Sequence, residues 1–588
     1  MEINRRTVIR SVTGAAALAT FGIAEGTAAT AYAATSSSGG STSRSASASA
    51  AYSLEFDPTA WSYDATNDVY YQVGKVYVAN PAATDYENLS IYVPGAYLTA
   101  TANSDGTTYS AKANPKGTVG QYSGRTAPIV IPVNTPGYAH QAPATSYSYT
   151  SVSEYLEAGL IYVWPGLRGR DSSTSTRSDA APWGVTDLKA AVRFLRYNRS
   201  VLPGSTDDIV LFGMSGGGAQ DTVAGTSGDS PLYFPYLRTI GAAMEDADGR
   251  PLSDAVAGVM AWCPITNLHE ANLSYEWNMG QFASTGTRAS TTWTSAYSAD
   301  LAKAWPKYVN RLALRDEQGK RLELTASSSG TYLAGSYYDH LIGVITTSLN
   351  NFLADNTFPY TITTMGGPPG SGSTGTSTTY ETVDDYIAYL NSASTWVTYD
   401  ATTNTATVSG LEGFVTSQKT ANKPVGAFDG YSRGQGENSV FAMGLNLPSH
   451  FAPLTRDVIK ANQTTYATYS DWNADYGFAA YDSDFAKKDS VGKDIAWRGE
   501  AYNPLYFLSP AFDGYRQSQV ARHWRIRTGI MQGDTANTTE INLALALRNY
   551  GIRDVDFATV WAEAHTMAER TGDPTANFIT WVKSVIKN

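Results

Sequence analysis

The sequence has only one cysteine, Cys263, so no disulfide can form within the chain. Its position at the end of the run Met260-Ala261-Trp262-Cys263 predicts a buried apolar residue rather than a nucleophile. Histidine is also scarce, with 6 residues in the chain, and no group of His, Cys and Asp has the spacing of a metal site. These absences favour a chemistry that needs no metal and no cofactor.

An excess of basic charge and long hydrophobic runs are missing too. The formal net charge is −11 and Lys and Arg form no stripe, which argues against nucleic acid as a partner. The apolar stretch at residues 14–24 is too short and too rich in Gly and Ala to span a membrane. No cysteine lies near it to carry a lipid, so we expect no membrane anchor.

The same stretch has the flanks of a targeting segment. Arg5-Arg6 precedes it, and Ala31-Tyr32-Ala33 follows it as an A-x-A cleavage pattern. We therefore predict a twin-arginine signal peptide over residues 1–33, with export to the periplasm or the cell exterior. The alternative is a cytosolic protein with a basic N-terminus. Residues 34–52 are rich in Ser, Ala and Gly and predict a flexible linker.

Apolar runs then alternate with helical patterns, which predicts an α/β fold with a mostly parallel, doubly wound sheet. The expected strands cover residues 128–131, 160–164, 209–214, 255–263, 524–530 and 554–560, with a helix at 185–196. Between 266 and 508 the pattern is interrupted, and helical pieces appear at 300–314, 338–354 and 383–390. We expect one core, residues 53–265 and 509–588, with a large lid or substrate-binding domain inserted at 266–508.

Ser215 lies in the segment GMSGGG (213–218), directly after the apolar run 209–212. A strand, a sharp turn with a serine at its apex and a helix that starts with small residues predict a nucleophile elbow. Glycine tolerates the strained backbone and the close neighbours of such a turn. The N–H of Gly216 would then point at the carbonyl oxygen of a bound ester. The alternative is an ordinary glycine-rich turn between a strand and a helix.

A serine nucleophile needs a base and an acid that orients the base. His565 follows the last predicted strand, where ligand-binding loops of such sheets lie, and we predict that it is the base. Asp534 follows the strand at 524–531 and is the candidate acid. The alternatives are a surface histidine that opens the C-terminal helix and an aspartate that caps the helix through residues 541–547.

The second oxyanion donor should come from the loop after the strand at 129–133. Pro136 has no N–H, so the backbone donor is expected at Thr135 or Gly137.

A series of short segments resembles the bacterial tannases, which are tannin acyl hydrolases with an α/β-hydrolase core. The resemblance covers most of the chain after residue 52. It rests on the order and spacing of WPGLRGRDS (164–172), DLKAAVRFLRYN (187–198), GMSGGGAQ (213–220), CPITNL (263–268), YEW (275–277), KPVGAFDG (423–430), GENSVF (436–441) and HWRIRTG (523–529).

The resemblance implies that Lys423 and Glu437 from the lid hold the phenolic hydroxyls of a galloyl ring, and that Asp534 completes this clamp. Phenol hydroxyls can donate to carboxylates and accept from an ammonium, and buried partners of this kind reject analogues that lack the hydroxyls. The alternative for Lys423 and Glu437 is a pair of solvated charges or a mutual salt bridge.

The chain departs from the family at Gln532. The family's loop reads Asp-x-Asp, in which the first Asp orients the histidine and the second contacts the galloyl group. An amide oxygen can accept from a histidine N–H but cannot stabilise an imidazolium by charge, and replacing a triad Asp by an amide can cost on the order of 10⁴ in rate. Three possibilities stay open: Asp534 serves the histidine, Glu563 substitutes for it, or turnover is slow.

The sequence therefore predicts a secreted serine esterase that hydrolyses galloyl esters through an acyl-enzyme, with a small phenolic ester as its partner. A feruloyl-type or general carboxylesterase is the first alternative. A non-catalytic hydrolase homologue that binds tannins or other phenolics is the second. No oligomeric state follows from the sequence.

Overall fold

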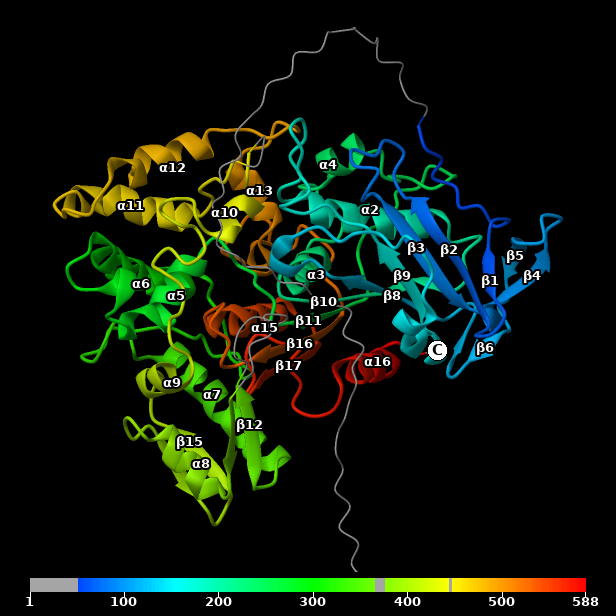
Figure 1. Ribbon diagram of the computed structural model, residues 1–588. Coiled ribbons are helices and arrows are strands. Elements are labelled where there is room, and N and C mark those ends of the chain that lie inside the picture. Colours follow the sequence, from blue (N-terminus) through cyan, green and yellow to red (C-terminus); the bar gives the residue numbers. More distant parts are fainter. Residues whose placement is uncertain (1–50, 365–375, 444–446, 588) are drawn as a thin grey trace, which may run out of the picture. The chain divides into compact units, whose positions relative to one another are not determined.

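The computed structural model describes residues 51–364, 376–443 and 447–587 (Figure 1). The predicted signal peptide and all but the last two residues of the predicted linker lie outside these ranges. The chain divides into a large unit, residues 47–360 and 380–588, and a small one. Within the small unit the described residues belong to a two-stranded sheet of β12 (Tyr360–Thr364) and β13 (Thr376–Tyr380).

A nine-stranded sheet forms the centre of the large unit, in the order β1-β2-β3-β9-β8-β10-β11-β16-β17. The strands from β9 to β17 run parallel, and β1, β2 and β3 form an antiparallel extension beside β9. In chain order the bounds are β1 (Ser62–Asp64), β2 (Val69–Val76), β3 (Asn88–Pro94), β8 (Pro128–Val133), β9 (Ile161–Pro165), β10 (Ser205–Met214), β11 (Gly258–Trp262), β16 (His523–Gly529) and β17 (Asp554–Val560). The predicted α/β class with a mostly parallel sheet is confirmed.

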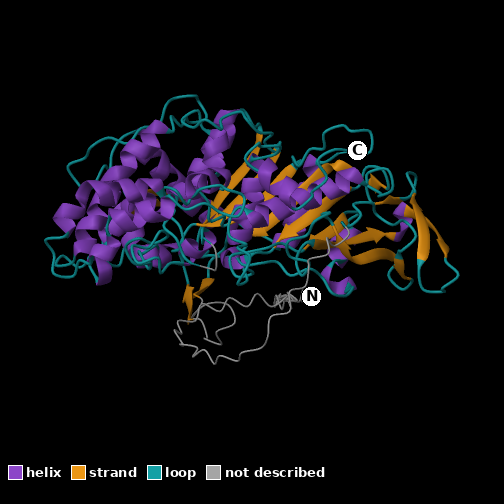
Figure 2. Cartoon of the chain, turned by 90° about the horizontal axis from the view of Figure 1, so that it is seen from above, coloured by secondary structure: helices purple, strands orange, loops and turns teal. Residues whose placement is uncertain are grey.

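Helices cover both faces of this sheet. Neighbouring residues of a strand point to opposite sides, so two adjacent residues of β10 identify the helix on each face. A Cβ atom at Gly213 of β10 would meet the backbone of Gly217 in α3 at 2.7 Å. The preceding residue, Phe212, instead packs on Phe578 of α16, with ring centroids 4.4 Å apart. Figures 1 and 2 show the strands lying between helices.

The helices that accompany the sheet are α1 (Ser153–Glu157), α2 (Trp183–Tyr197), α3 (Gly216–Thr226), α4 (Phe234–Thr239), α15 (Thr538–Tyr550) and α16 (Pro574–Val585). Between β11 and β16 the described chain adds no strand to the nine-stranded sheet. It forms α5 (Ala271–Asn278), α6 (Trp293–Arg311), α7 (Ser336–Asp355), α8 (Val383–Leu390), α9 (Leu411–Gln418), α10 (Gly436–Val440), α11 (Pro453–Tyr466), α12 (Phe478–Phe485), α13 (Ile495–Ala501) and α14 (Pro504–Leu508). The division into core and lid at residues 266 and 508 stays a prediction.

The predicted helix at 300–314 begins earlier than expected, at Trp293. The reason is the Thr292 cap, whose side chain accepts the Ser295 N–H and so satisfies a donor of the first turn. Small two-stranded sheets complete the fold: β4 (Leu98–Ala102) with β5 (Tyr109–Ala113), β6 (Thr118–Val119) with β7 (Tyr122–Ser123), and β14 (Val397–Asp400) with β15 (Thr405–Val408). Among the described helices, none is long and apolar enough to cross a bilayer.

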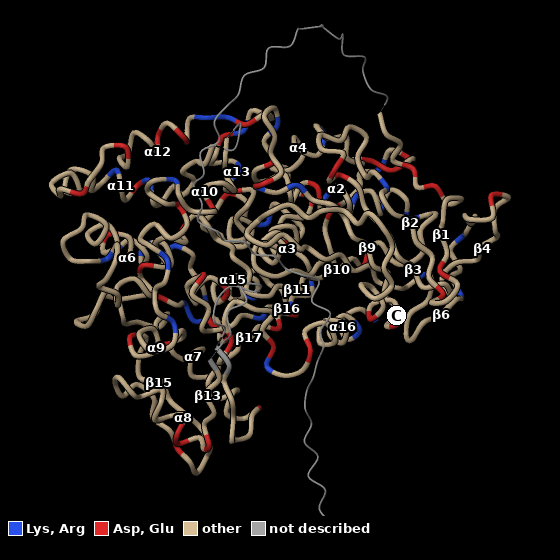
Figure 3. Tube along the Cα trace, in the orientation of Figure 1, with Lys and Arg blue, Asp and Glu red and all other residues tan. Residues whose placement is uncertain are grey.

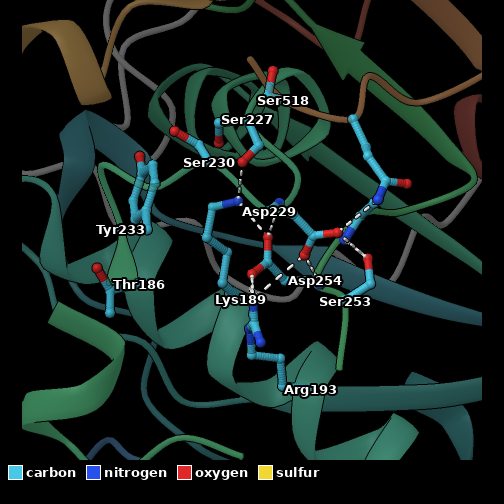
Figure 4. A network of polar contacts seen from close by, with 12 residues as sticks. Thr186, Lys189, Arg193, Ser227, Asp229, Ser230, Tyr233, Ser253, Asp254 and Ser518 are labelled. Atoms are coloured by element: carbon cyan, nitrogen blue, oxygen red, sulfur yellow. Dashed lines mark hydrogen bonds and ion pairs between the residues drawn. The ribbon is translucent and has the colours of Figure 1, made fainter. Parts of the chain in front are cut away.

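Residues of both charge signs lie along and around α2 (Figure 3), and Figure 4 shows a network of polar contacts that includes Lys189 and Arg193 of this helix. Lys189 donates to Asp254 at 2.8 Å and to the carbonyl of Ser227 at 2.7 Å, and Arg193 donates to the other oxygen of Asp254 at 2.7 Å. Asp254 accepts a further bond from the N–H of Asp229. The network ties α2 to the end of α3 and to the segment before β11, which are the elements around Ser215.

Burial opposes the ionisation of Asp254, but the charges of Lys189 and Arg193 outweigh it, so the pKa of this carboxyl is lowered. Its contribution to stability is therefore present above the unfolded pKa of about 3.9 and is lost as the pH falls through the lower folded value.

We expect Asp254→Asn to lower the free energy of unfolding by roughly 3–5 kcal/mol. The reason is that it leaves the buried Lys189 without its ion-pair partner and leaves Arg193 with only its 3.3 Å contact to Asp229. Denaturant-induced unfolding at pH 7 measures this. The control is Asp248→Asn, which breaks a 2.9 Å pair with Arg250 between side chains that are 67% and 70% exposed. That change should cost at most about 1 kcal/mol. Equal losses for the two variants would contradict this account of the network.

Candidate active site

Ser215 stands at the apex of a tight turn between β10 and α3. Its φ is 60° and its ψ is −124°, a conformation that is strained for a residue with a side chain. Two bonds hold the turn: the Ser215 N–H donates to the carbonyl of Trp262 at 3.0 Å, and the Ser215 carbonyl accepts from Ala219 at 2.9 Å. The backbone therefore has the shape that the predicted elbow requires.

The glycines after Ser215 let this turn pack against the loop that follows β8. A Cβ atom at Gly216 would lie 2.5 Å from the carbonyl oxygen of Thr135 and 2.5 Å from the nitrogen of Tyr138. A Cβ atom at Gly217 would lie 1.9 Å from the carbonyl oxygen of Val133. No side chain fits at either place, so glycine is required by close approach and the two loops lie in direct contact.

The loop after β8 is the one expected to supply the second oxyanion donor. It forms a short 3₁₀ turn, Pro136–Tyr138, in which Gly137 has a φ of 54°. The N–H of Tyr138 donates to the carbonyl of Thr135 at 2.9 Å and is therefore engaged. This leaves the amides of Thr135 and Gly137 as the candidates, and the choice between them stays a prediction.

His565 follows β17, and its Nδ1 atom lies 2.6 Å from Oε1 of Gln532. The carboxylate of Asp534 lies farther from the same nitrogen, at 3.7 Å. The carboxylate of Glu563 accepts from the hydroxyl of Thr566 at 2.9 Å. Gln532 thus forms a hydrogen bond with Nδ1, and Asp534 is within ion-pair range of the same nitrogen. The choice among the three possibilities left open by the sequence stays a prediction.

Two alternatives named above, Asp534 as a helix cap and His565 as the start of the C-terminal helix, are wrong. The helix α15 begins at Thr538 with Asn537 at its N-cap, so Asp534 is not that cap. The C-terminal helix α16 begins at Pro574, well beyond His565.

The end of β11 connects the serine loop with the histidine loop. Trp262 accepts the N–H of Ser215, as described above, and the next residue, Cys263, donates its thiol to the carbonyl of Thr566 at 3.2 Å. The sulfur also accepts the N–H of Gly529 at 3.4 Å. Burial raises the pKa of the Cys263 thiol to about 12, which agrees with the predicted buried residue that is not a nucleophile.

Lys423 and Glu437, the predicted clamp residues, lie next to each other. The ammonium of Lys423 is 3.6 Å from a carboxylate oxygen of Glu437 and 4.2 Å from the centre of the Phe428 ring. Both charged side chains are largely buried, with 20% and 11% exposure. The mutual ion pair that was the alternative is therefore present. The two groups would also offer a phenol one donor and one acceptor.

The hydroxyl of Tyr275, from the YEW segment, joins this pair to the loop of Gln532 and Asp534. It accepts the N–H of Lys423 at 3.0 Å and donates to the carbonyl of Gly533 at 3.2 Å. Arg288 donates to the carbonyl of Lys423 at 3.0 Å and pairs with Glu276 at 2.6 Å. These residues fix the backbone of Lys423, and their role is visible only once the fold has brought them together.

Two further charged residues lie under the same loop, and neither was found by sequence reasoning. Glu540 accepts from the side-chain amide of Gln532 at 2.8 Å, and the ammonium of Lys419 donates to the Gln532 carbonyl. Neither residue stands in a motif, so no sequence signal identified them. Within the described ranges no group of three or more His, Cys, Asp or Glu side chains could hold a metal ion.

Comparisons with known proteins agree with this fold. The family model described as BD-FAE matches residues 119–304. The tannase from Fusobacterium nucleatum is 25% identical, with a TM-score of 0.65 over 91% of this chain and 100% of that one. The native tannin acyl hydrolase from Lactobacillus plantarum is 25% identical, with a TM-score of 0.62 over 88% of this chain and 94% of that one. A tannin acyl hydrolase in complex with ethyl gallate is also 25% identical, with a TM-score of 0.62 over 91% of this chain and 99% of that one. No curated protein matches the sequence.

These findings confirm the resemblance to bacterial tannases. The chain has a tannase-like α/β-hydrolase fold and is a tannase-like carboxylic ester hydrolase.

We expect Gly216→Ala to lower kcat for any ester substrate by about 10²–10³-fold, because the new methyl group pushes the elbow away from the 135–138 loop and separates the two oxyanion donors. Steady-state kinetics on p-nitrophenyl acetate measures this. The control is Gly343→Ala in α7, where no atom lies within 4 Å of the added carbon and turnover should not change. Turnover of Gly216→Ala within threefold of the unchanged protein would show that this contact does not shape the site.

Proposed function

We propose that this protein is an exported serine esterase that hydrolyses galloyl and related phenolic esters. The observation that carries the proposal is the joint geometry at the end of β11. There, one residue accepts the N–H of Ser215 and the next bonds to Thr566, the neighbour of His565. Nucleophile and base thus stand on two loops that are held by the same strand end.

In the proposed reaction, the Ser215 hydroxyl attacks the ester carbonyl while His565 takes its proton. The N–H of Gly216, with that of Thr135 or Gly137, stabilises the oxyanion. His565 then protonates the departing alcohol. Water, activated by the same histidine, attacks the acyl-enzyme and releases the acid.

The acyl group is proposed from the charges beside this site. Lys423 can donate to a phenol oxygen, and Glu437 and Asp534 can accept from phenol hydroxyls. The 3.6 Å separation of the Lys423 and Glu437 charged groups suits two adjacent hydroxyls on one ring. The similar tannin acyl hydrolases solved with ethyl gallate and with 3,4-dihydroxybenzoate support this choice of ring.

A feruloyl-type or general carboxylesterase is the second candidate, and a specific observation favours it. The matched family model covers the elbow but ends at residue 304, before both Lys423 and Glu437. Since these two side chains already form an ion pair with each other, they do not by themselves require a galloyl ring.

The substrate test compares methyl gallate with p-nitrophenyl acetate, an ester without phenol hydroxyls on its acyl group. Lys423→Met removes one buried charged contact, worth about 1.5–3 kcal/mol. We expect this change to lower kcat/KM by roughly one to two decades for methyl gallate only. Ser215→Ala should abolish both activities. Lys460→Met, which removes a lysine 4.8 Å from the centre of the Phe478 ring, is the matched control and should change neither. Equal, small effects of Lys423→Met on both esters would leave a general esterase.

Export is proposed from the sequence alone, since Arg5 and Arg6 lie outside the described residues. Replacing both by Lys should leave unprocessed precursor inside the cell, as detected by immunoblotting of cell fractions. Normal appearance of the processed protein outside the cytoplasm would refute the twin-arginine route.

A further inference from the structure

Glu540 is a buried carboxylate behind the residue that contacts the proposed base. It lies in the first turn of α15 and is 1% exposed. One of its oxygens accepts from the side-chain amide of Gln532 at 2.8 Å, from the hydroxyl of Thr528 at 3.2 Å and from the hydroxyl of Thr535 at 3.3 Å. This oxygen thus accepts from three donors, which suits an ionised carboxylate.

The side chain of Gln532 stands between this carboxylate and the histidine. It is 2% exposed, its nitrogen faces Glu540 and Thr528, and its oxygen lies 2.6 Å from Nδ1 of His565. A primary amide donates at one end and accepts at the other. An ionised carboxylate only accepts, so it holds the NH₂ group toward itself and turns the amide oxygen toward the histidine.

The orientation of this amide decides which ring nitrogen of His565 carries the proton. An oxygen opposite Nδ1 places the proton on Nδ1 and leaves the lone pair of Nε2 to act as base. The reversed amide would place an NH₂ group opposite Nδ1 and put the proton on Nε2. The wrong tautomer is the reason why Asp→Asn in a serine-protease triad costs about 10⁴ in kcat.

We infer that Glu540 is a positioning residue that acts through Gln532 to hold His565 in the tautomer that can accept a proton from Ser215. The inference rests on the proposed role of His565 as base. The buried carboxylate supplies, one side chain farther away, the negative charge that is missing where the tannase family has an aspartate. The chain His565–Gln532–Glu540 thereby replaces a direct contact between histidine and acid.

Lys419, from the end of α9, completes the arrangement. Its ammonium donates to the backbone carbonyl of Gln532 and attracts the carboxylate of Glu540. Burial raises the pKa of Glu540 to about 7, and the Lys419 charge opposes this rise. Cys263 also faces this carboxylate, Asp534 lies near Lys419, and His565 lies on the other side of Gln532.

Protonation of Glu540 ends its control over the orientation of the Gln532 amide, because a protonated carboxyl can donate as well as accept. The acidic limb of the kcat/KM profile should therefore be steeper than a single ionisation, since it contains Glu540 as well as His565. This measurement needs no variant. A limb that fits one ionisation would overturn the inference.

The variant test is Glu540→Gln, in which the new amide no longer forces one orientation on Gln532. The lost charged hydrogen bond should lower kcat/KM by roughly ten- to a hundredfold. The factor should be the same for methyl gallate and p-nitrophenyl acetate, and the acidic limb should fit one ionisation. The matched control is Glu270→Gln at the N-cap of α5, another buried glutamate, whose pKa burial raises to about 8; it should leave both rates unchanged. A rate within threefold of the unchanged protein for Glu540→Gln would contradict the inference.

A double variant distinguishes a positioning role of Glu540 from a general requirement of the fold for a carboxylate at this place. In the double variant Glu540→Gln with Gln532→Asp, the aspartate accepts directly from Nδ1, and we expect at least a tenfold recovery over Glu540→Gln. Absence of recovery would overturn the inference. Failure of the galloyl assignment is distinguishable, because it changes only the ratio of the two substrates. Failure of the base assignment would show as retained turnover in His565→Ala.

Discussion

The hydrogen bond between the Gln532 oxygen and Nδ1 of His565 is the contact on which the proposed chemistry depends. It is 2.6 Å long, and Asp534 lies beyond hydrogen-bond range of the same nitrogen at 3.7 Å. A neutral amide at this place functions only if its oxygen faces the ring, and Glu540 determines that orientation. The cost of burying this carboxylate is offset in part by its three donors and by the charge of Lys419, and its pKa stays raised.

The same loop also connects the chemistry to the choice of substrate. Tyr275 bonds to the carbonyl of Gly533 and to the N–H of Lys423, so one hydroxyl links the segment beside His565 with the segment that carries the clamp lysine. A shift of either segment is therefore transmitted to the other through this hydroxyl. Proton transfer and recognition of the phenolic ring are therefore expected to respond together when Tyr275 is changed.

The central strands β8, β9 and β11 could be predicted because they are buried apolar runs, as parallel strands between two helix layers are. Strand β10 contains such a run in its second half, at residues 209–212. The tight turn at Ser215 could be predicted because glycines stand at fixed spacing around this serine. Strand β2, which lies next to the edge strand β1, was not expected, because most of its residues are only half-buried. Glu540 could not be found, since its helix pattern gives no sign that a carboxylate is buried. The partner of His565 depends on side-chain contacts between loops that are distant in sequence.

The most direct test of the central claim is the tautomer of His565 in the folded protein. Nitrogen-15 NMR of the imidazole, assigned by comparison with a His565→Gln variant and recorded above the pKa of the ring, distinguishes a proton on Nδ1 from one on Nε2. The account predicts that the neutral ring carries its proton on Nδ1, hydrogen-bonded to the Gln532 oxygen. A neutral ring with its proton on Nε2 would contradict the proposed orientation of Gln532 and the role of His565 as the base for Ser215.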